Sequence, residues 1–286
     1  MNKRSLYAVT AAAGLVLSLA ACGSDDGGDT GSDGTGGDGN GGDAASFDLV
    51  TDGTLTVCSD VPYVPFEDFD TSAPSGFSGF DIDIVSYIAE GLDLDLVVKD
   101  SSFEGLQSGL SLNAGECDLA ASAMTITDER AENLDFSEGY YDSLQSLLVP
   151  ADSDIAGIGD LSGKRVAVQQ GTTGESYATE NAEGAELVSF PSDAEMYQAI
   201  LASQVDAVLQ DLPANVPHTA DGKFTIVEEY DTDETYGLAM KKGNTALVDA
   251  VNEQLTELRD SGQYDEFYNQ YFSEDAAGDE AESTGR

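Results

Sequence analysis

The stretch from residue 117 to residue 130 constrains the fold most, because it joins a buried strand pattern to a turn rich in hydroxyl groups and then to an arginine. Residues 118–124 are small and apolar, which predicts a central strand buried on both faces. Thr125, Thr127 and Arg130 follow at its carboxyl end, where open α/β sheets bind ligands. A guanidinium beside free hydroxyl groups is suited to holding a carboxylate. The alternative is a surface arginine balanced by the acidic residues around it.

The amino terminus has the pattern of an export signal. A short basic head precedes an apolar run over residues 6–21, which is the length of a signal-peptide core and marginal for a membrane span. Leu19-Ala20-Ala21-Cys22 then resembles the lipobox of bacterial lipoproteins. We therefore expect residues 1–21 to be removed and Cys22 to carry the lipid, including palmitate. A buried helix or a plain cleaved signal is the alternative.

Polar, low-complexity segments flank the rest of the chain. Residues 22–45 are rich in Gly and Asp and lack aromatic and branched aliphatic side chains, so we expect a disordered tether with a reach of roughly 25 Å. Residues 276–286 form a second polar tail. Residues 46–275 are long enough for one large core or two smaller ones.

The charge of this folded part excludes some partners. Residues 46–275 carry 46 acidic side chains against eight Lys or Arg, a surface that repels nucleic acid and anionic lipid headgroups. We therefore expect no nucleic-acid partner and contact with the membrane only through the lipid. No metal-ligand spacing occurs, the single His218 lies in a loop flanked by proline, and we expect no cofactor.

Cys58 and Cys117 present opposing arguments about a disulfide. Export to an oxidising compartment permits one. Both residues, however, are expected on strands, and if those strands are parallel neighbours their offset is about three residues, or roughly 10 Å. That exceeds the Cα separation of about 7 Å that a disulfide spans, so the register favours free thiols.

Strand and helix patterns alternate along residues 46–275, which predicts parallel sheets with helices on their faces. The expected strands are 54–59, 94–98, 118–124, 146–149, 165–169, 205–211 and 236–240, and the expected helices are 80–91, 103 to about 115, one from about 175, one around 196–200, and 247–258. The aromatic side chains of 264–272 are expected to pack on a core. Two groups of strands with loops at their ends predict two lobes facing across a cleft, where small ligands bind.

The loop Gln170-Gly171-Thr172-Thr173-Gly174 stands between an expected strand and an expected helix. Glycines and hydroxyl residues there leave backbone N–H groups free for an anion. The loop lacks the GK[ST] ending of a phosphate-binding P-loop. A simple helix N-cap is the alternative.

Several segments together resemble the extracellular solute-binding proteins of family 3, which are polar amino-acid receptors of ABC importers. These segments are 58–67, 79–83, 118–130, 135–137, 161–164 and 205–211, in the family's order. The resemblance implies an α/β fold of two lobes, the periplasmic-binding-protein-like (Venus-flytrap) fold, each lobe a mostly parallel sheet flanked by helices. It implies a first lobe of 46–141 and 236–275, and hinge strands with a second lobe over 142–235.

The same resemblance implies the site. Arg130 would bind a ligand α-carboxylate with Thr125, Thr172 and Thr173, and Asp211 with the Ser122 carbonyl would bind the α-ammonium. The side-chain pocket would be lined by Asp60, Tyr63, Phe66, Phe103 and Gln169. A zwitterion needs an opposite charge at each end, and taking these from two lobes couples binding to closure. Ala123, Gln169 and Gly174 depart from the family pattern and leave the ligand's identity open.

The residues around the side-chain pocket favour a basic ligand. Segments 60–67, 103–107 and 169–174 contain no cation, and Lys164 and Arg165 lie about 15 Å along their strand from its ligand end. Aspartate and glutamate are therefore disfavoured, arginine, lysine or ornithine would meet Asp60, and glutamine is the close alternative. Asp60 could instead be a turn former.

We expect a monomeric, non-enzymatic receptor on the outer face of the cell membrane that serves the permease subunits of an ABC transporter. A dehydratase of cyclohexadienyl acids, with Asp60 or Glu67 as general acid, is one alternative. An adhesive surface lipoprotein is another.

Overall fold

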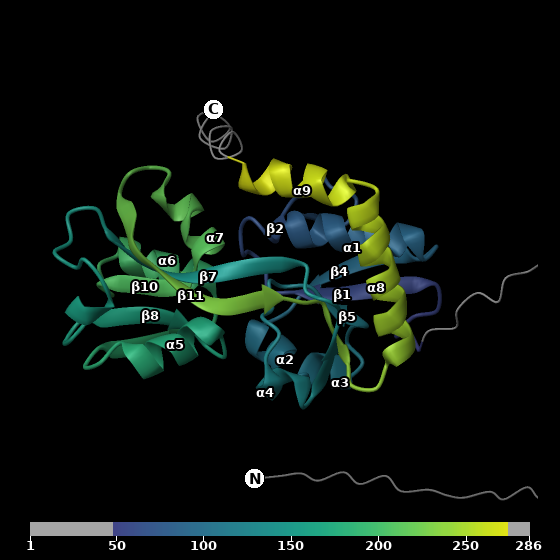
Figure 1. Cartoon of the computed structure of the whole chain (residues 1–286), viewed down its shortest axis with the longest axis horizontal. Coiled ribbons are helices and arrows are strands. Elements are labelled where there is room, and N and C mark those ends of the chain that lie inside the picture. The colour runs from purple at the N-terminus through teal and green to yellow at the C-terminus, as the bar shows by residue number, and fades with distance from the viewer. Residues whose placement is uncertain (1–47, 274–286) are drawn as a thin grey trace, which may run out of the picture. The chain divides into compact units, whose positions relative to one another are not determined.

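The computed structural model describes residues 48–273, which form two five-stranded sheets joined by two long strands (Figure 1). The expected signal segment, Cys22, the tether and the polar tail lie outside the described residues. Within 48–273, none of the helices has both the length and the apolar character needed to span a bilayer.

The first sheet has the order β4-β1-β5-β12-β6 and forms the first lobe. Its strands are β1 (Thr54–Ser59), β4 (Asp95–Asp100), β5 (Leu119–Ala120), β6 (Leu134–Phe136) and β12 (Ala239–Lys241). β5 lies at the centre, parallel to β1 and antiparallel to β12. Residues 118–124 are all buried, as predicted, but the strand among them is much shorter than predicted. Ala123 has a φ of 44°, so the chain turns out of the sheet before it.

Three helices pack together on the first lobe: α1 (Phe80–Gly91), α8 (Thr245–Asp260) and α9 (Gln263–Phe272) (Figure 1). α1 has the predicted bounds. The apolar face predicted for α8 is buried, and the aromatic side chains of α9 pack mainly on the core, with Tyr268 more exposed. The single helix expected from 103 is instead two, α2 (Phe103–Gln107) and α3 (Leu110–Asn113), because Gly109 between them adopts a left-handed φ of 75°. The remaining short elements of this lobe are β2 (Asp68–Phe69), β3 (Phe77–Ser78) and α4 (Asp128–Ala131).

The second sheet has the order β11-β7-β10-β8-β9. Its strands are β7 (Tyr141–Pro150), β8 (Arg165–Gln169), β9 (Glu186–Phe190), β10 (Ala207–Asp211) and β11 (Phe224–Tyr236). Its helices are α5 (Thr173–Asn181), α6 (Asp193–Leu201) and α7 (Leu212–Asn215), with the 3-10 turns η1 (Ile158–Asp160) and η2 (Pro217–Thr219).

The strands β7 and β11 connect the lobes as an antiparallel pair, from Tyr141 opposite Tyr236 to Pro150 opposite Phe224. The end of β11 also accounts for one difference from the sequence-based expectations. The return strand expected at 236–240 is divided, because Tyr236 ends β11 and the first sheet is joined only by β12. The predicted fold class is confirmed, because in each sheet four strands run in one direction and only one, β12 in the first sheet and β7 in the second, is antiparallel to its neighbours.

Cys58 and Cys117 form a disulfide with a Cα separation of 5.8 Å, so the argument for free thiols is wrong. That argument assumed that Cys117 lies in the strand, whereas β5 begins only at Leu119. Lys99 is the register partner of Cys58 on β4, and its ammonium donates to the Glu116 carbonyl at 2.8 Å. The chain before β5 therefore crosses over β1, which places Cys117 beside Cys58.

Candidate ligand-binding site

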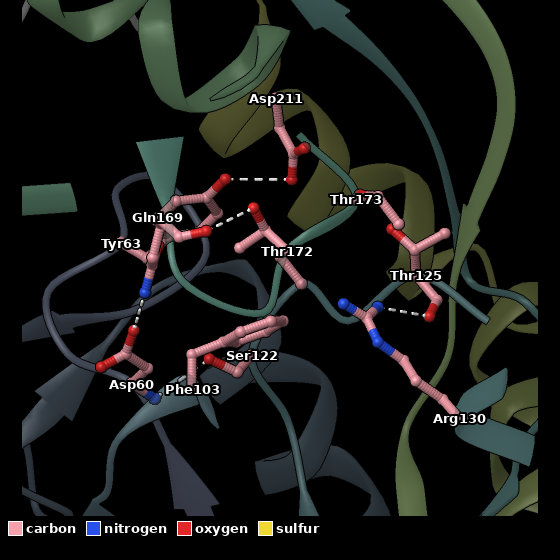
Figure 2. Close-up of a pocket in the computed structure, with 11 residues that line it drawn as sticks. Asp60, Tyr63, Phe103, Ser122, Thr125, Arg130, Gln169, Thr172, Thr173 and Asp211 are labelled. Carbon is pink, nitrogen blue, oxygen red and sulfur yellow. Dashed lines mark hydrogen bonds between the residues drawn. The ribbon is translucent and has the colours of Figure 1, made fainter. Parts of the chain in front are cut away.

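One pocket is lined by residues of both lobes (Figure 2). The lining side chains are Asp60, Tyr63, Phe103, Ser122, Ala123, Thr125 and Arg130 of the first lobe and Gln169, Thr172, Thr173 and Asp211 of the second. The pocket is narrow, with a cavity volume of about 20 Å³. A ligand larger than this cavity can enter only when the side chains or the lobes move apart. The structure thus brings together ten of the eleven residues predicted for the ligand site.

Phe66 is the exception and a correction. Its ring is fully buried in the core of the first lobe, with ring centroids of Tyr141 and Tyr236 at 5.2 and 5.3 Å. Within the segment 60–67, the residues that line the pocket are Asp60 and Tyr63. Sequence spacing could not separate these orientations, because the segment 60–67 is an irregular loop without a fixed periodicity.

Arg130 is presented by the short helix α4, whose N-cap Thr127 accepts a hydrogen bond from the Arg130 backbone N–H. The buried guanidinium donates to the Thr125 carbonyl at 2.7 Å and, across the pocket, to the Gly171 carbonyl at 3.0 Å, and it lies 5.2 Å from the centroid of the Phe103 ring. Burial lowers its pKa, opposed by the charges of nearby acids. None of the ion pairs among residues 48–273 includes Arg130. Its position suits an incoming anion.

Asp211 ends β10 and is the acidic counterpart of Arg130 in the pocket. It accepts hydrogen bonds from the hydroxyl groups of Tyr63, at 2.9 Å, and of Tyr236, and from the Gln145 amide. Burial, together with the charge of Glu234, raises the Asp211 pKa to about 6. Tyr63 belongs to the first lobe, so this hydrogen bond crosses the pocket.

Glu234 on β11 is buried beside the site, and sequence reasoning missed it. Its carboxylate accepts from the hydroxyl groups of Thr125 and Thr173, both at 2.7 Å, and from the Gln145 amide at 3.0 Å. Each hydroxyl has a single proton, so a ligand carboxylate competes with Glu234 for the same donors. The sequence held no signal for this role, because Glu234 ends an acidic run that is typical of a solvated strand.

Asp60 lies at the end of the pocket opposite Arg130 (Figure 2). The Gln169 amide of the second lobe donates to the Asp60 carboxylate at 2.6 Å (Figure 2). It also donates to the Pro191 carbonyl at 3.1 Å. Burial raises the Asp60 pKa to about 7, the hydrogen bond from Gln169 opposes this shift, and the charges of Asp100 and Asp193 add to it. A carboxyl group with this pKa responds strongly to a cation placed beside it.

The loop 170–174 has features of both interpretations of its sequence, a loop that lines a ligand site and a helix N-cap. Thr172 is the N-cap of α5, accepting from the Glu175 backbone N–H at 3.1 Å, and its hydroxyl donates to the Gln169 carbonyl at 2.8 Å. The Gly171 N–H is taken by the Glu175 carboxylate at 2.8 Å. The loop therefore lines the pocket and caps a helix, with the Gly171 N–H unavailable to an anion.

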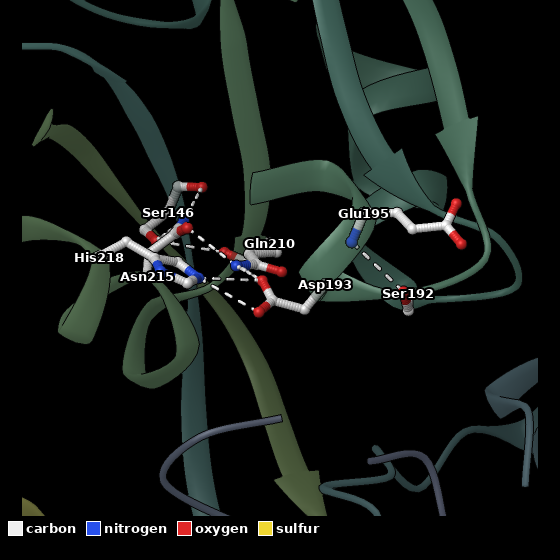
Figure 3. Close-up of polar contacts among 7 residues, drawn as sticks. All are labelled: Ser146, Ser192, Asp193, Glu195, Gln210, Asn215 and His218. Atoms are coloured by element: carbon white, nitrogen blue, oxygen red, sulfur yellow. Dashed lines mark hydrogen bonds and ion pairs between the residues drawn. The ribbon is translucent and has the colours of Figure 1, made fainter. Parts of the chain in front are cut away.

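A polar network holds the strand end that presents Asp211 (Figure 3). The Gln210 amide donates to Asp193 at 2.7 Å and to the Asn215 side-chain carbonyl at 3.0 Å, and Asn215 donates to the Ser146 hydroxyl at 2.9 Å. The His218 ring lies 3.2 Å from both Asp193 oxygens. His218, unassigned from sequence, is thus tied to Asp193, whose charge raises the Asp60 pKa.

The chain is similar to several known proteins. Residues 55–274 match the model of the family described as "Bacterial extracellular solute-binding proteins, family 3". The chain is 34% identical over 204 residues to the ABC transporter glutamine-binding protein of Bacillus subtilis (70% of this chain, 74% of the relative). It is 31% identical over 249 residues to the lysine/arginine/ornithine-binding periplasmic protein of Escherichia coli (82% and 94%). A solved ancestral arginine-binding protein bound to glutamine has a TM-score of 0.73 and 33% identity, covering 78% of this chain and all of that one.

Proposed function

The chain belongs to the bacterial extracellular solute-binding proteins of family 3, and from this we propose that it is an amino-acid receptor that delivers its ligand to an ABC importer. One observation carries the proposal: Arg130 of the first lobe and Asp211 of the second line the same pocket. A free amino acid is the small molecule whose α-carboxylate and α-ammonium match these two charges.

In the proposed complex, Arg130 binds the α-carboxylate through its free N–H groups, beside the loop at Thr172 and Thr173. The hydroxyl groups of Thr125 and Thr173 would turn from Glu234 to the ligand. Asp211 and the Ser122 carbonyl receive the ammonium. Enclosure removes water from both charged ends, so each needs its partner in place. Since the partners come from different lobes, only the closed form satisfies both, and binding shifts the population toward closure.

We propose a basic side chain, that of arginine, lysine or ornithine, directed at Asp60 beside Tyr63, Phe103 and Gln169. Arg130 is the only cation among the pocket-lining residues, and Arg165 is engaged elsewhere by Asp206 at 2.9 Å. An acidic side chain would therefore meet Asp60 without a counter-charge. Glutamine is the second candidate, because its amide could share Asp60 with Gln169, and because relatives of both specificities are similar to this chain.

The proposal includes the location of the receptor. Lipidation at Cys22 after removal of residues 1–21 would anchor a monomeric receptor to the outer face of the membrane, with residues 22–45 as tether, near the permease subunits. Labelling with a radioactive fatty acid would test this, and Cys22→Ala should abolish the label and release the protein from the membrane fraction.

The test of function is a thermal-shift screen of the purified protein against the common amino acids and ornithine, followed by calorimetry. Ligand that binds only the folded state raises the melting temperature by mass action. We expect the largest shift from a basic amino acid. No shift from any amino acid would reject the proposal, and formation of an aromatic product from prephenate or arogenate would establish the dehydratase alternative instead.

A further inference from the structure

Two carboxyl groups lie fully buried below the pocket, in the core of the first lobe. Glu67 follows the loop that carries Asp60 and Tyr63, and Asp81 lies in the first turn of α1. Neither takes part in an ion pair with any Lys, Arg or His among residues 48–273. Two buried negative charges without a cation are very costly, so the pair must be neutralised in another way.

The backbone places the segment that ends at Glu67 against the segment that carries Asp81. The Asp81 N–H donates to the Phe66 carbonyl at 3.0 Å, and the Phe80 N–H donates to the Pro65 carbonyl at 3.0 Å. Gly79 permits this approach, because a Cβ there would lie 2.1 Å from the Phe66 oxygen. The chain before Glu67 is therefore fixed against the start of α1.

Each carboxyl group uses one oxygen and leaves the other without a partner. Glu67 Oε1 accepts from the Ser122 hydroxyl at 2.6 Å, while Asp81 Oδ2 accepts from the Tyr140 hydroxyl at 2.7 Å and the Ala123 N–H at 2.9 Å. Glu67 Oε2 and Asp81 Oδ1 are buried and have no hydrogen-bond partner. A proton between two such oxygens converts two unsatisfied acceptors into a hydrogen bond.

The electrostatics agree with this geometry. Burial raises the Glu67 pKa well above its ordinary value, and the charge of Asp81 raises it further. Burial raises the Asp81 pKa to about 7, opposed by the hydrogen bonds from Ala123 and Tyr140. The charge of Asp60 also raises the Glu67 pKa. The Tyr140 hydroxyl stays un-ionised, because burial and the charge of Asp81 raise its own pKa.

We propose that Glu67 and Asp81 share one proton between their two unpartnered oxygens and that this pair positions the Ser122–Ala123 turn at the floor of the pocket. The turn is held from both sides, since Glu67 binds the Ser122 hydroxyl and Asp81 binds the Ala123 N–H. Ala123 is strained at a φ of 44°, which persists only under such restraint. The Ser122 hydroxyl also accepts from the Asp60 N–H at 3.0 Å. Both pocket segments therefore depend on the pair.

Amide substitutions test the shared proton without any ligand. In Glu67→Gln, the amide oxygen keeps the bond to Ser122 and the amide N–H replaces the shared proton toward Asp81. Asp81→Asn is the mirror case. We expect each single variant to melt within about 3 °C of the parent at pH 7. The double variant places two N–H donors face to face, so its melting temperature should fall by about 5 °C or more beyond the sum of the singles.

Asp118→Asn is the matched control. Asp118 is also buried in this lobe, but its two oxygens accept from the backbone N–H groups of Val50 and Thr56, at 2.6 and 2.8 Å. An asparagine there must direct its amide N–H at one of these backbone N–H groups. This single variant should therefore melt at a lower temperature than the parent. The infrared difference spectrum, parent minus double variant, should also contain the carbonyl stretch of a protonated carboxylic acid, because the Asp60 contribution is common to both and cancels.

Other outcomes overturn the proposal. If both groups were ionised, each single amide would raise the melting temperature and the double would raise it further. If a cation lay between them, each single variant would lose as much stability as the double. Only the positioning role rests on the proposed function: we expect the singles to bind the amino acid within about threefold of the parent and the double to lose at least about tenfold. If no amino acid binds the parent, the melting data still decide the shared proton.

Discussion

Gln169 of the second lobe and Asp60 of the first are joined across the pocket by a hydrogen bond of 2.6 Å. Figure 2 shows Arg130 on the far side of the pocket from this pair. The pocket is therefore polarised, with a guanidinium at one end, an acid at the other, and Asp211 on the second lobe. This distribution of charges orients a zwitterionic ligand and restricts the charge that the ligand's side chain can carry.

Replacing Arg130 by Lys should weaken amino-acid binding by about 10²–10⁴-fold, or about 3–5 kcal/mol. A lysine keeps the charge but loses the planar fork that reaches the Thr125 and Gly171 carbonyls and a ligand carboxylate together. Isothermal titration calorimetry measures the loss. Arg165→Lys, at an exposed ion pair with Asp206, is the matched control and should bind as the parent does. Equal affinity in Arg130→Lys would reject the carboxylate assignment.

Amino-acid affinity should fall as the pH drops below about 6. The Asp211 pKa is raised to about 6 by burial, and only the ionised form pairs with an ammonium group. Bound ligand lowers this pKa, so binding releases a proton at lower pH, and affinity declines by up to about tenfold per pH unit. Titrations between pH 4.5 and 8 measure the profile.

The variant Asp211→Asn should bind about 3–5 kcal/mol more weakly and lose this pH dependence. The pH dependence of folding stability has the opposite sign to that of ligand affinity. Because burial raises the Asp211 pKa in the folded state, its contribution to stability is fully present below the ordinary carboxyl pKa and is lost as the pH rises through about 6. An affinity in the parent that does not change between pH 5 and 7 would contradict the ammonium role.

Reducing the Cys58–Cys117 disulfide should lower the free energy of unfolding by about 2–4 kcal/mol. The bond closes a loop over a sequence separation of 59 residues, and its loss frees the unfolded chain. Denaturant titrations with and without a reductant measure the difference, and Cys58→Ala/Cys117→Ala, which lacks both thiols, is the control that the reductant should not affect. An unchanged midpoint in the reduced parent would show that the bond does not stabilise the fold.

The fold could be predicted where local pattern and burial agree. The helix α1 follows from a glycine and helical spacing, and β1 and β8 follow from short apolar runs. Prediction failed where tertiary contacts override the pattern. Gly109 breaks a helix in the left-handed region, Ala123 ends β5 early, and the chain before β5 crosses over β1 to bring Cys117 to Cys58. None of these is encoded in periodicity.

Strand ends indicated part of the pocket, since Thr125 and Arg130 follow the strand pattern of 118–124 and the loop 170–174 follows that of 165–169, whereas the full set of site residues was implied by the family resemblance. Asp211 ends β10 and Gln169 ends β8, and the carboxyl ends of neighbouring strands meet. Phe66 was assigned wrongly because an irregular loop does not fix which side chain turns inward. Glu234 and the pair Glu67 and Asp81 were missed as partners because buried acids look the same in sequence as exposed ones, and only contacts separate them.

Calorimetry at pH 7 should distinguish a basic ligand from glutamine through Asp60. Burial raises the Asp60 pKa to about 7, so the group is partly protonated in the free protein. A cationic side chain beside it lowers the pKa and expels that proton, whereas a neutral amide does so far less. Titrations in buffers of different ionisation enthalpy count the protons released. Asp60→Asn should remove this release and weaken arginine binding at least about tenfold, with a smaller effect on glutamine. Equal proton release by arginine and glutamine in the parent would mean that the ligand side chain does not meet Asp60.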